Sequence, residues 1–106
     1  MSDVPALQLR RMINGYQVSQ AIYVAATLGV ADLLAGGRQT SGELAKGAGA
    51  HPDSLYRLLR ALAAAGVVRE EEGRSFSLTP VGELLRTDAD GSLAGWAAFV
   101  GRPYHW

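Results

Sequence analysis

The chain has 106 residues, of which 48% are hydrophobic and 19% charged, and this balance excludes a disordered polypeptide, which would be poor in apolar residues. Ten basic and ten acidic residues cancel, so no overall field draws the chain to nucleic acid or to an anionic membrane. With no cysteine, disulfides and thiolate metal sites are excluded, and the length predicts a single domain over residues 1–106 with one core.

The first residues have no long apolar core behind basic residues and no small-residue cleavage site, so no signal peptide is predicted. No run reaches the about 18 consecutive apolar residues that a membrane-spanning helix needs. We therefore expect a cytoplasmic protein without a membrane partner.

Residues 5–14 place apolar side chains at near-helical spacing before the stop signal Asn14-Gly15, which predicts a short first helix. We interpret residues 1–15 as an N-terminal arm or helix. The apolar residues of this arm are Leu7, Leu9, Met12 and Ile13.

Residues 16–34 predict a second helix, which is broken at Gly29 and is followed by a short apolar turn. Between Ala21 and Leu28 this helix has almost no polar side. A helix that is apolar all round must be covered on two sides, and a domain this small has few elements with which to cover it. We therefore expect a second copy of the chain to supply the other side.

Thr40 and Glu43 have the spacing of a capping box, which predicts a short helix from residue 41 to about residue 48 that buries Leu44 and Ala45. His51-Pro52 then opens a longer helix that Gly66 ends. Its core-facing positions follow the spacing i, i+3, i+4, i+7 and are Leu55, Leu58, Leu59, Leu62 and Ala65.

Residues 67–69 and 74–78 flank a Glu-Gly turn, and in the second stretch Phe76 and Leu78 alternate with Ser75 and Ser77, which predicts a two-stranded β-hairpin. Thr79-Pro80 predicts the start of another short helix. Ser92 is placed to cap a last helix, rich in small and aromatic residues, that stops near Gly101.

The order of these elements predicts a mainly α fold, a winged helix-turn-helix-like domain with a small two-stranded hairpin. One use of such a scaffold is DNA binding by a transcriptional regulator, and we keep it as the alternative function. The helix would then present Asp53, Ser54, Tyr56, Arg57 and Arg60 to the bases. However, the wing carries three consecutive glutamates at residues 70–72, and their charge would repel DNA.

The other use is oligomerisation. Three nearly nonpolar, alanine-rich runs at residues 21–26, 61–68 and 93–100 together exceed what one small core requires. We therefore predict a homodimer with no nucleic-acid partner. The residues expected at its interface are Val18, Ala21, Ile22, Ala25, Ala26, Trp96 and Phe99.

The segments at residues 19–34, 51–68 and 76–88, with the terminal GRPYHW, resemble the N-terminal dimerisation domain of S-adenosylmethionine-dependent O-methyltransferases. The resemblance implies a winged-helix-like domain that exchanges helices with a second subunit. It also implies a following Rossmann-like domain that binds the methyl donor and supplies a histidine base, with residues 92–106 starting the connection to it. The parent enzyme would methylate a hydroxyl of a phenolic or polyketide-type small molecule.

Within this chain the sequence predicts no catalytic, cofactor-binding or metal-binding residue. No glycine-rich loop follows a strand, and His51 and His105 are 54 positions apart without a carboxylate cluster. We therefore expect an inactive, truncated piece of the parent, to which the small-molecule substrate binds only when the catalytic domain is present. The resemblance further implies that some residues line that substrate pocket, and the candidates are Met12, Tyr16, Tyr104, His105 and Trp106.

Overall fold

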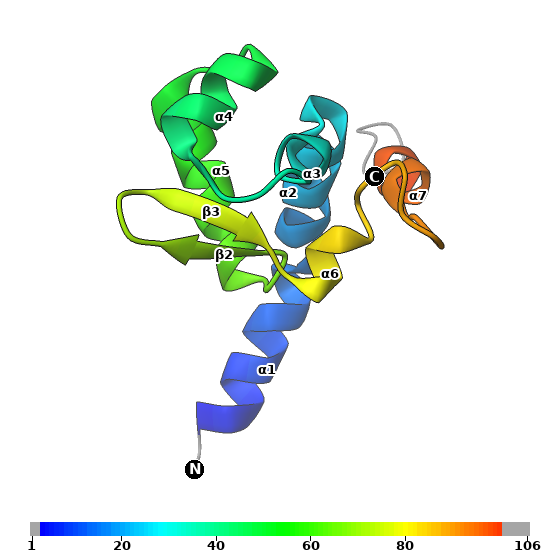
Figure 1. Cartoon of the computed structure of the whole chain (residues 1–106). Coiled ribbons are helices and arrows are strands. Elements are labelled where there is room, and N and C mark those ends of the chain that lie inside the picture. The colour runs from blue at the N-terminus through cyan, green and yellow to red at the C-terminus, as the bar shows by residue number, and fades with distance from the viewer. Residues whose placement is uncertain (1–2, 101–106) are drawn as a thin grey trace.

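The structure, a computed structural model, describes residues 3–100. The fold is mainly helical with a small antiparallel sheet, which confirms the predicted fold class (Figure 1). The elements in chain order are α1 (Asp3–Ile13), α2 (Gly15–Leu28), α3 (Val30–Leu33), β1 (Gln39–Thr40), α4 (Ser41–Ala48), α5 (Pro52–Ala64), β2 (Val68–Glu71), β3 (Ser75–Leu78), α6 (Pro80–Glu83) and α7 (Ala94–Val100).

The sheet has three strands in the order β1-β3-β2, so the prediction of a two-stranded hairpin was incomplete. The hairpin β2–β3 is present with Val68 opposite Leu78, and β1 adds to its free edge with Gln39 opposite Phe76. The backbone N–H of Ser41 donates to the Arg74 carbonyl at 2.9 Å and continues this edge. A strand of two residues has no alternating pattern, and therefore the sequence did not reveal it.

The predicted capping box is confirmed at the start of α4. The Thr40 hydroxyl accepts from the Glu43 N–H at 3.1 Å, and the Glu43 carboxylate accepts from the Thr40 N–H at 2.8 Å. The backbone hydrogen bond from Thr40, followed by that of its hydroxyl, lowers the pKa of Glu43. The next helix begins as predicted, with His51 as N-cap, since its Nδ1 accepts from the Ser54 N–H at 3.4 Å.

The core lies where α2, α3, α4 and α5 meet the sheet, and its largest fully buried side chains are Val30, Leu44, Leu59, Leu62 and Phe76. This confirms Leu44, Ala45, Leu55, Leu59 and Leu62 as core residues.

Ala65 was expected in the core but is exposed. It is the C-cap of α5, and the chain turns away directly after it at Gly66, which has a φ of +85°. The helical spacing of core positions therefore ends at Leu62, and its extension to Ala65 was wrong.

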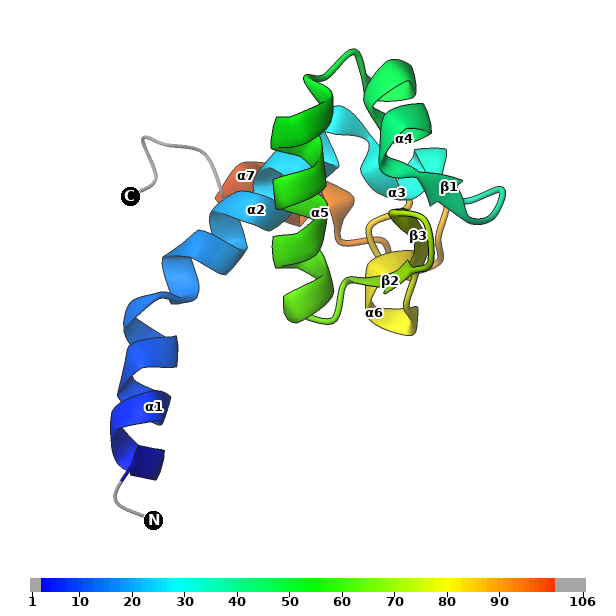
Figure 2. The ribbon, with the colours of Figure 1, turned by 90° about the vertical axis from the view of Figure 1, so that its left-hand side faces the viewer.

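Helix α1 leads away from the body that the other elements form (Figures 1 and 2). Its junction with α2 is short and hydrogen-bonded. The Asn14 N–H donates to the Arg10 carbonyl at 3.0 Å, and the Gln17 N–H donates to the Asn14 carbonyl at 2.9 Å. The arm is thus a helical extension of α2 with a bend at Asn14.

The corner between α5, the hairpin and α6 is tightly packed. The Thr79 hydroxyl donates to the carbonyls of Gly66 and Val67, at 2.6 and 2.9 Å, and accepts from the Gly82 N–H at 3.2 Å. Gly82 lies so close to Val67 that a Cβ atom at this position would overlap the Val67 carbonyl oxygen. Only glycine fits at this contact.

We predict that Gly82→Ala lowers the free energy of unfolding by about 3 kcal/mol, because the added methyl group forces the backbone of α6 away from Val67. Urea unfolding followed by circular dichroism measures the change. The matched control is Gly95→Ala in α7, where no atom lies within 4 Å of the new Cβ and where the change stays within about 1 kcal/mol. Equal effects of the two substitutions would contradict the assigned role of Gly82.

Candidate functional site

Helix α1 is short, and its large apolar side chains are exposed. Met12 is 71% exposed and Ile13 is 62% exposed. A helix of 11 residues is only marginally stable alone in water, so α1 needs a surface on which to bury these side chains. The other exposed apolar residues of the arm are Val4, Leu7 and Leu9, and Tyr16, Val18 and Val24 continue the exposure into α2.

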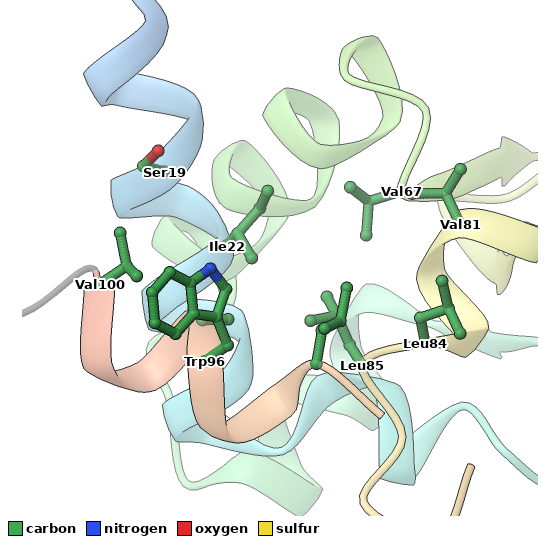
Figure 3. A pocket seen from close by; sticks show the side chains of 10 residues that line it. Ser19, Ile22, Val67, Val81, Leu84, Leu85, Trp96 and Val100 are labelled. Atoms are coloured by element: carbon green, nitrogen blue, oxygen red, sulfur yellow. The ribbon is translucent and has the colours of Figure 1, made fainter. Parts of the chain in front are cut away.

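A cavity of about 260 Å³ lies between α2, α6, α7 and the corner after α5. Figure 3 shows Trp96 and Val100 of α7 on one side of it and Val81 and Leu84 on the other. We call it the α6–α7 pocket. The side chains that line it are apolar except for the Ser19 hydroxyl and the indole nitrogen of Trp96, and they belong to Ser19, Ile22, Val67, Val81, Leu84, Leu85, Leu93, Trp96, Ala97 and Val100.

The segment between α6 and α7 forms one wall of this pocket and is fixed by Asp32 of α3. The Asp32 carboxylate accepts from the Thr87 N–H at 2.9 Å and from the Thr87 hydroxyl at 3.0 Å. The Leu93 N–H donates to the Leu84 carbonyl at 2.8 Å and closes the segment. Asp32 is therefore a structural anchor of the pocket wall.

Arg86 adds a second set of polar contacts to the same segment. Its guanidinium donates to the carboxylates of Glu83, at 2.9 Å, and of Asp88, at 3.0 and 3.1 Å. The hydrogen bond from Arg86 lowers the pKa of Asp88, and the hydrogen bond to Asp88, followed by that to Glu83, raises the pKa of Arg86. These charged side chains lie at the surface. They orient the segment between α6 and α7 and do not close the pocket.

Helix α7 presents an aromatic pair to solvent. Trp96 and Phe99 stack with ring centroids 6.0 Å apart, and Trp96 is 64% exposed. The helix packs extensively on α2 and yet none of its residues is fully buried. Exposed aromatic side chains beside an apolar pocket are typical of protein–protein interfaces.

The predicted interface residues do not all lie at the surface. Ala25 is only 3% exposed and belongs to the chain's own core, so its side chain offers no surface to a partner. The sequence did not distinguish the side of α2 that faces α5 from the side that faces outward. Val18, Trp96 and Phe99 are exposed, Ala21, Ile22 and Ala26 are half-buried, and Ile22 lines the α6–α7 pocket.

Among the predicted substrate-pocket residues, Met12 and Tyr16 are exposed on α1 and α2. Tyr104, His105 and Trp106 lie outside the described residues. The sequence analysis did not single out Leu84 or Leu93, which the fold brings to the α6–α7 pocket from a segment without strong periodicity.

The face that a DNA-binding use would require carries no surplus of positive charge. Arg60 lies 3.5 Å from the Glu70 carboxylate, which also accepts from the Tyr56 hydroxyl at 2.9 Å. Arg74 stacks over the Tyr56 ring, 4.3 Å from its centroid. Four arginines of α5 and the hairpin are balanced by four carboxylates, namely Arg57, Arg60, Arg69 and Arg74 against Asp53, Glu70, Glu71 and Glu72. This balance of charges does not support DNA binding, the alternative function.

Residues 3–100 bring together no group of three or more histidines, aspartates or glutamates that would hold a metal ion. Over the same range, each helix is too short or too polar to cross a membrane.

Comparison with known proteins gives a consistent result. The family model described as the O-methyltransferase dimerisation domain matches residues 10–88. The chain is 43% identical over 93 residues to the phenazine O-methyltransferase PhzM of Lysobacter antibioticus, a match that covers 88% of this chain and 27% of that protein.

Two solved structures are similar in fold. The mitomycin 7-O-methyltransferase MmcR superposes with a TM-score of 0.88 at 33% identity, over 99% of this chain and 31% of that one. The O-methyltransferase NcsB1 from neocarzinostatin biosynthesis, in complex with S-adenosyl-L-homocysteine, has a TM-score of 0.77 at 42% identity, over 86% of this chain and 30% of that one. The chain thus spans less than a third of the length of these relatives.

We predict that Asp32→Ala lowers the free energy of unfolding by about 1 kcal/mol, because Thr87 loses the acceptor for its two hydrogen bonds at an exposed site. Denaturant unfolding measures the loss. Asp90→Ala is the control, since Asp90 is an exposed carboxylate of the same segment with no hydrogen bond or ion pair within residues 3–100. An Asp32 variant as stable as the Asp90 variant would show that the wall does not depend on this anchor.

Proposed function

The chain belongs to the family of O-methyltransferase dimerisation domains, and we propose that it joins two subunits of a small-molecule O-methyltransferase into a homodimer. The observation that carries this proposal is the apolar arm α1, which extends from the body with its large side chains exposed (Figure 2). Such an arm can bury its apolar surface when two chains associate, which is favourable by roughly 25 cal/mol per Å² of apolar surface buried. The exposed Trp96 and Phe99 add anchors of the type that dominates interface energetics.

The activity of the whole parent protein is part of the same proposal. The methyl donor would be S-adenosylmethionine, in line with the S-adenosyl-L-homocysteine complex of NcsB1, and it would bind to a separate catalytic domain. The relatives named above methylate oxygen in a phenazine and in mitomycin, or act in neocarzinostatin biosynthesis, and by analogy the acceptor here would be a hydroxyl of an aromatic or polyketide-type molecule in natural product biosynthesis. We place the parent in the cytoplasm.

The single domain over residues 1–106 would connect to the catalytic domain through residues 92–106. In this arrangement Met12 on the arm and Tyr16 in the first turn of α2 can contribute apolar and stacking contacts to the substrate pocket, together with Tyr104, His105 and Trp106. The dimer therefore both holds the subunits together and completes the pocket.

Light scattering coupled to size exclusion is expected to show a mass near twice 11.2 kDa. Val18→Asp is expected to raise the dissociation constant by about 100-fold, or about 2.7 kcal/mol, because a carboxylate would be buried without a partner. Lys46→Asp, at an exposed position of α4, is the control and is expected to leave the mass unchanged. A monomeric mass for the unaltered chain at high micromolar concentration would refute the proposed homodimer.

A further inference from the structure

We propose that the α6–α7 pocket binds an uncharged aromatic alcohol of up to two fused rings. This inference goes beyond the proposed homodimer and does not depend on it, because the residues that line the pocket all belong to one chain. Three observations carry it, namely the polar atoms of the lining, its lack of charge, and the contacts that hold its walls apart.

Two polar side-chain groups lie in the otherwise apolar lining. They are the Ser19 hydroxyl of α2 and the indole N–H of Trp96 of α7, and both lie on the side of the pocket opposite Val81 and Leu84 (Figure 3). Within residues 3–100 neither group has a hydrogen-bond partner. A ligand hydroxyl can accept from Trp96 or donate to Ser19. A few polar groups in an apolar lining are typical of a small-molecule site.

The lining has no ionisable side chain, and this decides the charge of the ligand. An ion placed there would lose its water without gaining a counter-ion, which is costly. An anion would also meet residues 83–90, the segment that contributes two leucines to the lining. This segment carries three carboxylates and one guanidinium, a net charge of −2. The ligand is therefore neutral, and a single hydroxyl matches the polar groups of the lining.

The size and the shape of the pocket fit an aromatic ring system. The volume is about 260 Å³, and a cavity of roughly 150 Å³ already accepts a benzene-sized molecule, so a second ring has room. Trp96 lines one side with its indole, and aromatic rings attract one another in offset or edge-to-face contacts. Ile22 and Val67 add branched apolar surface. An aromatic ligand thus gains ring contacts in addition to apolar burial.

The pocket is held open by hydrogen bonds that lie outside its lining. The Asp32 carboxylate accepts from the N–H and the hydroxyl of Thr87 and fixes the segment after α6. The Thr79 hydroxyl donates to the Val67 carbonyl and fixes the start of α6. Sites for small molecules are usually formed before the ligand arrives. Walls that are already fixed lower the entropic cost of binding.

A second copy of the chain is the competing occupant, because Trp96 is also an anchor of the proposed dimer. The exposed apolar side chains of Met12, Ile13 and Val18 lie outside the lining, so a second copy has a surface to cover without entering the pocket. Aliphatic side chains in the pocket would leave the Ser19 and Trp96 groups without a partner, which is costly. A ligand with a hydroxyl satisfies them.

The probe is 2-naphthol, which has two fused rings and one hydroxyl and is uncharged near neutral pH. Titration calorimetry on the unaltered chain is expected to give a dissociation constant on the order of 100 µM, as suits so small a ligand. The methyl ether 2-methoxynaphthalene cannot donate and is expected to bind about fivefold more weakly. The anion 2-naphthoate is expected to bind at least about tenfold more weakly. In nitrogen-15 NMR spectra the largest shift on adding 2-naphthol is expected at the Trp96 indole N–H.

Variants of the lining locate the site. Ala97→Phe places a ring in the pocket from α7 and is expected to abolish binding. Val81→Phe, at a 60% exposed position of α6, fills the pocket from the other wall and is used where Ala97→Phe does not fold. Ser19→Ala is expected to weaken 2-naphthol about fivefold and to leave 2-methoxynaphthalene unchanged. Thr27→Ala removes a hydroxyl of α2 that lies outside the lining and is the matched control, expected to change neither affinity.

Each outcome decides between the ligand site and its alternatives. Binding that a folded filling variant abolishes and Ser19→Ala weakens supports the site. No heat and no shift with 2-naphthol at about 1 mM, or binding that survives the filling variants, overturns it. Equal affinities for 2-naphthol and its methyl ether overturn the hydroxyl recognition. Binding that appears only after dilution to the monomer assigns the pocket to the second copy and overturns the ligand site. Light scattering of the same samples reports the homodimer separately, so either proposal can fail alone.

Discussion

The apolar character of α2 is the constraint on which the rest of the structure depends. A helix with nonpolar side chains on nearly every face cannot lie at a surface, and a domain of this length covers it only in part. Ala25 faces the core with α5, and Ile22 faces the α6–α7 pocket. Val18 and Val24 remain exposed. The position of α7 against α2 follows from the same need, since packing on α2 covers one further side.

The polar contacts of the domain position this apolar framework. Thr79 ties α6 to the end of α5, and Asp32 ties the segment after α6 to α3. Neither contact buries a charge, yet each fixes a segment that has little apolar surface of its own. The α6–α7 pocket exists because these segments are held apart from α7, whereas a looser corner would allow Leu84 and Leu85 to collapse into the space.

Local signals allowed most elements to be predicted from the sequence. The capping box at Thr40 and the proline starts after His51 and Thr79 are short-range chemistry, and so they appear in the structure at the expected residues. Strand β1 was missed because its pairing with β3 is a contact between distant residues. Ala25, which was expected at the interface, is buried in the chain's own core, and the sequence did not indicate this for a related reason. An apolar helix sequence indicates that both sides of the helix are covered. It does not indicate which of the two sides is covered by the helix's own domain.

The bend at Asn14 has a consequence for how the arm finds a partner. Hydrogen bonds link Asn14 to Arg10 and Gln17 to Asn14 across the bend. The arm therefore leaves the packed helix α2 at a defined angle and is not joined to it by a flexible linker. The backbone entropy of the junction residues Arg10, Asn14 and Gln17 is thus lost when the monomer folds, not when two monomers meet. Association then does not have to fix the direction in which the arm leaves α2, which lowers the entropic cost of forming the pair.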